Sequence, residues 1–146
     1  MKYSHGAFNV VIVNQRVLLV KRRDFPLWDL PGGVVELDEL PSEAAIREMY
    51  EETGYEIQID YEFAQYIDKT RNDCQHLFVS QIVGGELKRT TSETRDLRWF
   101  SLNQLPLFII PNRKRQIQDA LTIKNFEEYE ISENWLISLI RNIVKK

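Results

Sequence analysis

The sequence is poor in the features that mark secreted, membrane and nucleic-acid-binding proteins. Its single cysteine, Cys74, cannot form a disulfide within the chain, which suits a reducing cytoplasm. No apolar run approaches the roughly 18 residues of a membrane span, and the segment Met1–Gly6 lacks the apolar core of a signal peptide. The net charge is −3, whereas dedicated nucleic-acid binders carry a basic excess. We therefore expect a cytoplasmic protein with no membrane partner, and the charge disfavours a nucleic-acid partner.

The remaining composition is that of an ordinary globular domain. Apolar residues make up 43% of the 146 residues and charged residues 28%. A chain of this length can bury roughly two thirds of its unfolded surface, so it can fold without disulfides or structural metals. The chain has no internal repeat, low-complexity segment or long linker. We expect a single domain over residues 1–146.

Short apolar runs and amphipathic stretches alternate along the chain. Two apolar runs flank Asn14-Gln15 and predict a buried hairpin, while apolar residues at helical spacing follow Pro41 and Ser132. Mixed strands and helices predict an α/β (α+β) fold in which helices flank both faces of a mixed β-sheet. The expected strands are 10–13, 17–20, 28–30, 55–63, 76–83 and 96–100, and the expected helices are 40–53, 112–121 and about 132–146.

Three glutamates share one ridge of the helix expected over residues 40–53. Glu48, Glu51 and Glu52 stand at i, i+3 and i+4, within an arc of roughly 100°. The neighbouring arc carries apolar residues such as Met49, so the carboxylates border the buried face, where unbalanced negative charge is costly. Arg47 can offset this cost only in part. A hard dication such as Mg²⁺ or Mn²⁺ would remove it, and a solvated acidic face is the alternative.

A glycine pair precedes this helix. Gly32-Gly33 permits a sharp turn and a close approach to a ligand, and Gly33 can offer its carbonyl oxygen to a metal ion. The alternative is an ordinary turn. Glu36 and Glu39 add two carboxylates between the glycines and the helix. The loop and the helix thus form one compact acidic cluster.

The spacing of these residues resembles the Nudix box. Gly33 is followed after five residues by Glu39, and after seven more by the run from Arg47 to Tyr55. The seven fixed positions of the box all match, which makes the signal far stronger than a lone glycine motif. The sequence departs from the usual pattern at Tyr55, where an aliphatic residue is common, and at Asp38 and Leu40.

The resemblance implies a Nudix-type α/β/α sandwich and a hydrolase. Members of the family use water to cleave a pyrophosphate bond in a nucleoside diphosphate linked to another moiety, with Mg²⁺ or Mn²⁺ as cofactor. Carried over by motif position, the metal ligands would be Glu48, Glu51, Glu52 and the carbonyl of Gly33. Arg47 would orient Glu51 through an ion pair, and Glu39 would lie at the edge of the metal cluster.

The general base and the substrate contacts stay open at this stage. Glu52 is one candidate base, and Glu93 is another, since many family members hold a catalytic glutamate in the loop before the corresponding strand. Arg22 and Arg23 follow an expected strand and can reach substrate phosphates, although a solvated loop is the simpler interpretation.

Two other functions compete with the hydrolase. A Nudix-type domain can bind a nucleotide as a sensor without turnover, but such a role would fit a missing box glutamate, and none is missing. An RNA 5′-end pyrophosphohydrolase is disfavoured by the negative net charge. Homodimers are common in the family, although no residue here demands one.

Some residues outside the box receive no functional assignment from the sequence. Cys74 lies in a polar stretch without a recognisable thiolate-activating cluster, and His76 reads as a structural residue at a strand start. The basic run Arg113-Lys114-Arg115 reads as a wet helix face.

Overall fold

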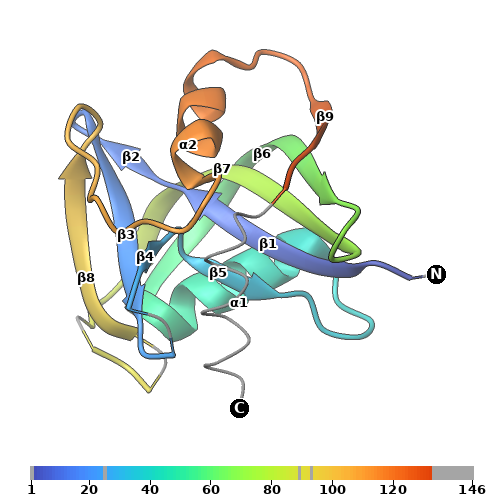
Figure 1. The fold of residues 1–146 in the computed structure, drawn as a ribbon. Coiled ribbons are helices and arrows are strands. Elements are labelled where there is room, and N and C mark those ends of the chain that lie inside the picture. The colour runs from blue at the N-terminus through green and yellow to red at the C-terminus, as the bar shows by residue number, and fades with distance from the viewer. Residues whose placement is uncertain (1, 25, 89, 93, 133–146) are drawn as a thin grey trace.

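The computed structural model describes residues 2–24, 26–88, 90–92 and 94–132, and Figure 1 shows its fold. It is a mixed α+β structure of two sheets and two helices within these residues. The strands are β1 (Ser4–Val10), β2 (Ile12–Val13), β3 (Arg16–Arg22), β4 (Trp28–Asp29), β5 (Gly32–Val34), β6 (Tyr55–Asp68), β7 (Asp73–Gly85), β8 (Thr94–Ser101) and β9 (Glu127–Glu130), and the helices are α1 (Pro41–Thr53) and α2 (Arg113–Thr122).

The larger sheet has the strand order β5-β1-β7-β6-β9. Strand β1 runs parallel to β7 and antiparallel to β5, and the long hairpin β6–β7 is antiparallel. The glycine pair lies on β5, where Gly33 is the register partner of Ala7. This pairing places the start of the Nudix-type motif at the edge of the sheet, beside helix α1.

The smaller sheet contains the predicted hairpin. Strand β3 pairs with β2, β4 and β8, and Asn14 and Gln15 connect β2 to β3 with φ values of 51° and 64°. Positive φ at both central residues is the geometry of a type I′ hairpin turn, whose twist matches that of the strands. The expectation from residues 10–20 is thus confirmed for this hairpin.

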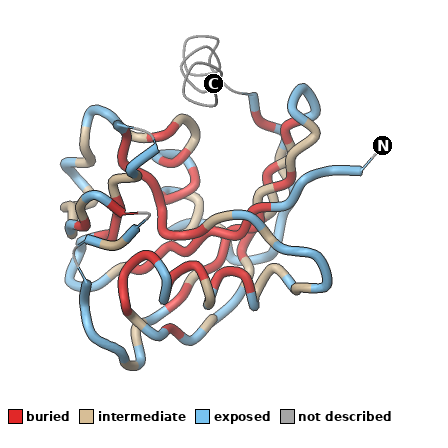
Figure 2. Tube along the Cα trace, turned by 90° about the horizontal axis from the view of Figure 1, so that it is seen from below, coloured by how far each residue is buried: buried red, intermediate tan, exposed pale blue. Residues whose placement is uncertain are grey.

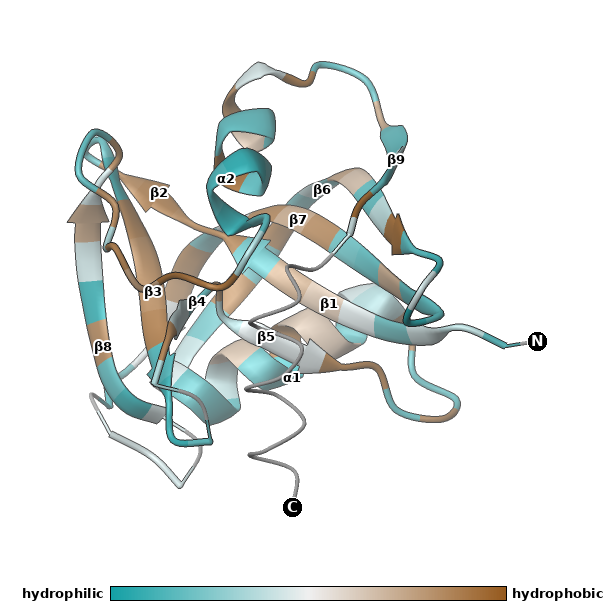
Figure 3. Ribbon diagram, in the orientation of Figure 1, coloured by the Kyte–Doolittle hydropathy of each residue, from teal (hydrophilic) through white to brown (hydrophobic). Residues whose placement is uncertain are grey.

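Helices α1 and α2 cover opposite faces of the larger sheet (Figure 1). The α2 side holds the main apolar core, in which Phe8, Phe63 and Tyr66 pack with Ile117 of the helix. On the α1 side, Ala44 and Ala45 pack on Ala7 and Phe78. Figure 2 shows the buried residues running through the centres of the strands, and Figure 3 shows that α2 is largely hydrophilic apart from this contact.

The predicted fold class is confirmed, and most of the helices and strands lie within a few residues of their predicted positions. Helix α1 ends at Thr53, followed by Gly54 in the left-handed conformation with φ of 81°, the usual helix C-cap. The expected helix over residues 132–146 lies almost entirely outside the described residues. Within the part of the chain that the structure describes, no helix is both long and apolar enough to cross a membrane.

Candidate active site

A cavity of about 690 Å³ opens beside the glycine pair. It is lined by residues of β1, β3, β4, β5, β7 and α1, together with the β6–β7 turn and the segment that leads into α2. This volume suits a nucleotide-sized ligand, since small-molecule sites commonly enclose roughly 300–1,000 Å³. Three residues of the predicted metal cluster line it, namely Gly33, Glu48 and Glu52.

Glu52 is the most deeply buried acid of the cluster, with 3% of its surface exposed. Its Oε1 accepts the backbone N–H of Gly32 at 2.7 Å. Burial raises the pKa of Glu52 well above its ordinary value, in spite of this hydrogen bond, and the nearby Glu48 raises it further. A cation bound beside this carboxyl would stabilise its ionised form.

Gly33 lies directly against the carboxyl group of Glu48. A Cβ at Gly33 would lie 2.6 Å from the carboxyl carbon of Glu48 and 2.7 Å from its Oε1, far inside van der Waals contact. Only glycine therefore lets the β5 backbone and this carboxylate share one wall of the cavity. The set of donors, two glutamates and a nearby main chain, fits a hard cation such as Mg²⁺ or Mn²⁺.

Arg47 connects the loop after β5 to the acidic ridge. Its Nε and Nη2 donate to the two oxygens of Glu39 at 2.7 and 3.0 Å, and Nη2 also donates to the carbonyl of Val34 at 3.0 Å. Its Nη1 donates to Glu48 at 3.0 Å and to Glu51 at 3.3 Å. The predicted Arg47–Glu51 contact is present, but Arg47 orients Glu48 as well.

The hydrogen bonds from the Arg47 guanidinium are the main reason that the pKa of Glu39 falls to about 2. A carboxyl with a depressed pKa in the folded state stabilises the fold above its unfolded pKa of 4.5 and loses this contribution as the pH falls toward 2. We expect Glu39→Gln to lower the midpoint of urea unfolding at pH 7. The difference in midpoint between the variant and wild type should shrink as the pH falls from 4.5 to 2. Urea unfolding followed by circular dichroism at several pH values measures this difference. An unchanged gap at pH 3 would contradict the ion-pair explanation.

The remaining predicted residues lie at different distances from the cavity. Arg22 lines it and pairs with Asp24 at 2.8 Å, a contact that raises the pKa of the Arg22 guanidinium. Glu51 is exposed and is not among the residues that line the cavity. Arg23 is exposed too, and donates from Nε to the carbonyl of Thr91 at 2.7 Å. Glu93 lies outside the described residues.

A buried ion pair that no local sequence pattern indicates lines the cavity. Asp29 and Arg113 are 4% and 3% exposed, and Arg113 Nε donates to Asp29 Oδ1 at 2.5 Å. The guanidinium also lies over the ring of Phe8, 3.9 Å from its centroid. The interpretation of the 113–115 run as a wet helix face is therefore wrong for Arg113. Its partner is 84 positions away, too far for a local pattern to show.

Asn9 fixes helix α1 against the sheet and so sets the position of the acidic ridge. Its Nδ2 donates to the carbonyls of Ala45 at 3.0 Å and Pro31 at 3.3 Å. Its Oδ1 accepts the hydroxyl of Ser80 at 2.9 Å. A fully buried asparagine with these three partners costs little to bury and joins α1, β7 and the segment before β5.

The charge of the cavity is negative before any cation binds. Six acidic side chains line it against three arginines among the described residues. The acids are Asp24, Asp29, Glu48, Glu52, Asp68 and Asp73, and the arginines are Arg22, Arg71 and Arg113. A phosphate ligand would be repelled by this lining unless cations bound with it.

Residues 3–121 match the family model of the NUDIX domain. A putative 8-oxo-dGTP diphosphatase of Bacillus subtilis (strain 168) is 49% identical over 118 residues, which cover 80% of this chain and 79% of that protein. An ADP-ribose pyrophosphatase of Methanocaldococcus jannaschii is 32% identical over 133 residues, covering 84% and 78%. The crystal structure of a NUDIX hydrolase from Nitrosomonas europaea superposes with a TM-score of 0.76 at 22% identity, covering 91% and 81%.

The mixed α+β fold and the carboxylate-rich cavity suit an enzyme that binds phosphates together with cations. The family match extends over most of the chain, and the chain therefore belongs to the Nudix family. It is a Nudix hydrolase, which cleaves a pyrophosphate bond in a nucleotide-type substrate.

Proposed function

We propose that this hydrolase acts on small nucleotides in which a nucleoside diphosphate is linked to another group, with Mg²⁺ or Mn²⁺ as cofactor. The observation that carries the proposal is the excess of carboxylates in a nucleotide-sized cavity. Such a lining needs cations before it can hold a polyphosphate. Divalent metals are in general use among Nudix hydrolases.

We assign the metal ligands to Glu48, Glu51, Glu52 and the carbonyl of Gly33. When bound, the metal supplies charge neutralisation for the phosphates and lowers the pKa of a coordinated water. Arg47 is a positioning residue, because its guanidinium contacts Glu48 and Glu51 rather than the cavity itself. The N–H of Gly32 holds one oxygen of Glu52 in place.

The proton of the attacking water needs an acceptor. Glu52 is our first candidate, since its buried carboxyl lines the cavity and the N–H of Gly32 holds one of its oxygens in place. Glu93 is the second candidate. The position of Arg22 in the cavity lining supports it as a phosphate contact. Arg23 and Glu39 have weaker support as substrate contacts, because they are engaged with Thr91 and Arg47.

The names of the relatives indicate which compounds to test first. The relative with 49% identity is named for 8-oxo-dGTP, and the relative with 32% identity for ADP-ribose. Both compounds contain a pyrophosphate bond next to a nucleoside, in agreement with the proposed class.

The test is hydrolysis of a panel by the purified chain with Mg²⁺, with Mn²⁺ and after chelation. The panel contains ordinary and oxidised nucleoside triphosphates, ADP-ribose and nucleoside diphosphate sugars, with phosphate release measured with and without added phosphatase. We expect a nucleoside monophosphate from at least one compound, with kcat/KM at least a hundredfold above the panel median. Chelation should stop the reaction, and Mg²⁺ or Mn²⁺ should restore it.

Other outcomes would redirect the proposal. Tight binding of one compound without turnover under any metal would favour the sensor. Turnover confined to added 5′-triphosphorylated or capped RNA would favour the RNA 5′-end pyrophosphohydrolase.

Several expectations from the sequence stay predictions beside this proposal. They are a cytoplasmic location, based on the single cysteine, a single domain that extends to residue 146 with a tail helix, and a homodimer.

A further inference from the structure

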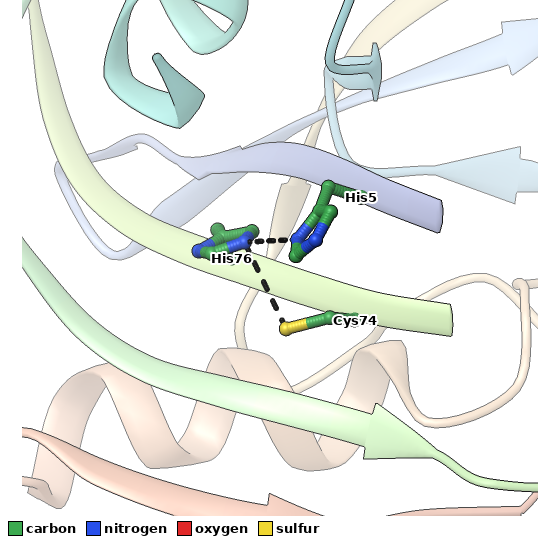
Figure 4. A group of neighbouring side chains, drawn as sticks. All are labelled: His5, Cys74 and His76. Atoms are coloured by element: carbon green, nitrogen blue, oxygen red, sulfur yellow. Dashed lines mark hydrogen bonds between the residues drawn. The ribbon is translucent and has the colours of Figure 1, made fainter. Parts of the chain in front are cut away.

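Two strands bring a cysteine and two histidines together outside the predicted cluster of carboxylates. His5 on β1 is the register partner of Cys74 on the parallel strand β7, and His76 lies two residues further along β7. Residues two positions apart on a strand share one face of the sheet. Cys74 and His76 therefore lie on the same face as Phe78, which packs against α1. Figure 4 shows the three side chains converging.

The distances from His76 to the other two ligand atoms are close to those of a tetrahedral metal site. The Nδ1 of His5 lies 3.0 Å from the Nε2 of His76, and the Sγ of Cys74 lies 3.7 Å from the same nitrogen. All three atoms lie within 4.8 Å of one another. Zinc bonds of about 2.0–2.1 Å to nitrogen and 2.3 Å to sulfur place two tetrahedral nitrogens about 3.4 Å apart and a nitrogen and sulfur about 3.6 Å apart. The two distances from His76 Nε2 are thus within about 0.4 Å of the values that a tetrahedral zinc ion requires.

A carboxylate already orients one of these histidines as a metal ligand. The Nδ1 of His76 lies 2.8 Å from Oε2 of Glu62 on β6. An ionised carboxylate can only accept, so Nδ1 carries the proton. In the neutral ring, the lone pair is then on Nε2, the nitrogen that faces His5 and Cys74. Metal-bound histidines commonly have such a carboxylate behind them, and it raises their basicity.

The chemistry of the donors selects the ion. A thiolate with two imidazoles suits Zn²⁺, whereas Mg²⁺ prefers oxygen ligands. Cys74 and His76 are buried, and His5 is exposed and provides access from solvent. Neither Cys74 nor His76 lines the cavity, and His5 alone of the three reaches its rim.

The geometry points to a zinc site formed by His5, Cys74 and His76, with Glu62 supporting His76 and a water completing the coordination. It is separate from the metal cluster proposed for catalysis. The ion joins β1 to β7. Because β1 also pairs with the glycine-bearing strand β5, zinc stabilises the part of the sheet that carries the motif. A ligand that binds only the folded state stabilises it, so the melting temperature should rise as the zinc concentration increases.

The test uses Co²⁺ as a spectroscopic substitute for zinc, on the full chain freed of metal by a chelator and kept reduced. Cobalt bound to a thiolate gives a charge-transfer band in the near ultraviolet, and cobalt bound only by carboxylates does not. We expect this band to saturate at one equivalent of Co²⁺. Zinc should abolish it, and a large excess of Mg²⁺ should leave it unchanged.

Variants separate the three ligands from the catalytic glutamates. Cys74→Ser should lose the band and the zinc-dependent rise in melting temperature. His76→Ala should weaken cobalt binding at least tenfold, and Glu62→Gln should weaken it about 10–100-fold while keeping the band. The control Glu51→Gln should match wild type in the cobalt charge-transfer band and in the zinc-dependent rise in melting temperature.

Two outcomes would overturn the site. One is the absence of the band in wild type that is folded by circular dichroism, a result that does not depend on any variant. The other is a band that His76→Ala and His5→Ala leave at full affinity, which would indicate a lone thiolate.

Discussion

Replacing Glu52 by glutamine is expected to lower kcat on the order of 10³-fold while the chain stays folded. Loss of a positioned proton acceptor commonly costs about 10²–10⁴ in rate, and the same change removes a proposed metal ligand. Glutamine keeps the shape of the side chain and an oxygen that can accept the N–H of Gly32. Steady-state kinetics on the substrate found in the panel, at several Mg²⁺ concentrations, measures the effect.

The stability of this variant carries separate information. Burial opposes the charge of Glu52 and raises its pKa, so removing the charge should leave the melting temperature of the metal-free chain unchanged or higher. Mg²⁺ should raise the melting temperature of wild type more than that of Glu52→Gln. A variant that unfolds would show that Glu52 is structural, and its kinetics would then be uninformative.

Glu93→Gln is the matched comparison for the general base. If Glu52→Gln retains activity within tenfold of wild type and Glu93→Gln does not, the proton acceptor is Glu93 and our first assignment is wrong. If only Glu52→Gln loses activity, Glu93 has no part in proton transfer.

Gly33→Ala tests the same cluster from the backbone side. The added methyl would displace the carboxylate of Glu48, which is the end of a flexible side chain, so the fold should survive and activity should fall. Gly32→Ala is the contrasting variant, because its Cβ would lie 2.1 Å from the carbonyl oxygen of Ala7. That clash is with backbone, and it should unfold the strand pair. The contrast separates a site defect from a fold defect.

Local sequence predicted those parts of the structure that local physics determines. Helix α1 was expected over residues 40–53 and runs from Pro41 to Thr53, since apolar spacing and the following Gly54 are properties of neighbouring residues. The hairpin at Asn14-Gln15 was expected for the same reason. Spacing alone also predicts that Glu48, Glu51 and Glu52 lie on one helix, and α1 carries all three; their role as metal ligands stays a prediction.

Features that depend on distant partners were not predicted. Strand β1 begins at Ser4 because it pairs with β7, some 70 positions away, and the residues before Val10 have no strong alternation of their own. Cys74 and His76 received no role because the third member of their group is on another strand. The local signal for this group is a cysteine and a histidine two positions apart in the 74–83 region, which share one face of a strand.

The ion pair of Asp29 and Arg113 is another feature that depends on distant partners. Among the substitutions proposed here, breaking it should lower the free energy of unfolding most. We expect Asp29→Asn to lower the free energy of unfolding by about 3–5 kcal/mol, the usual cost of leaving one buried charge without its partner. Asparagine still offers an oxygen to the backbone N–H of Leu30, which Asp29 accepts at 2.7 Å. The loss therefore reports the charge and not that hydrogen bond.

Arg113→Met should cost less, because Asp29 also has Arg22 at 3.8 Å and methionine keeps much of the contact with Phe8. The double variant Asp29→Asn with Arg113→Met removes both charges, and its cost should fall short of the sum of the two single costs by about 1–3 kcal/mol, as expected for residues in direct contact. Urea unfolding at pH 7 of the four proteins gives this coupling. Strictly additive costs would mean that each residue acts through other neighbours. Strong coupling would mean that the buried charge pair itself holds β4, just ahead of the glycine pair, against the first residue of α2.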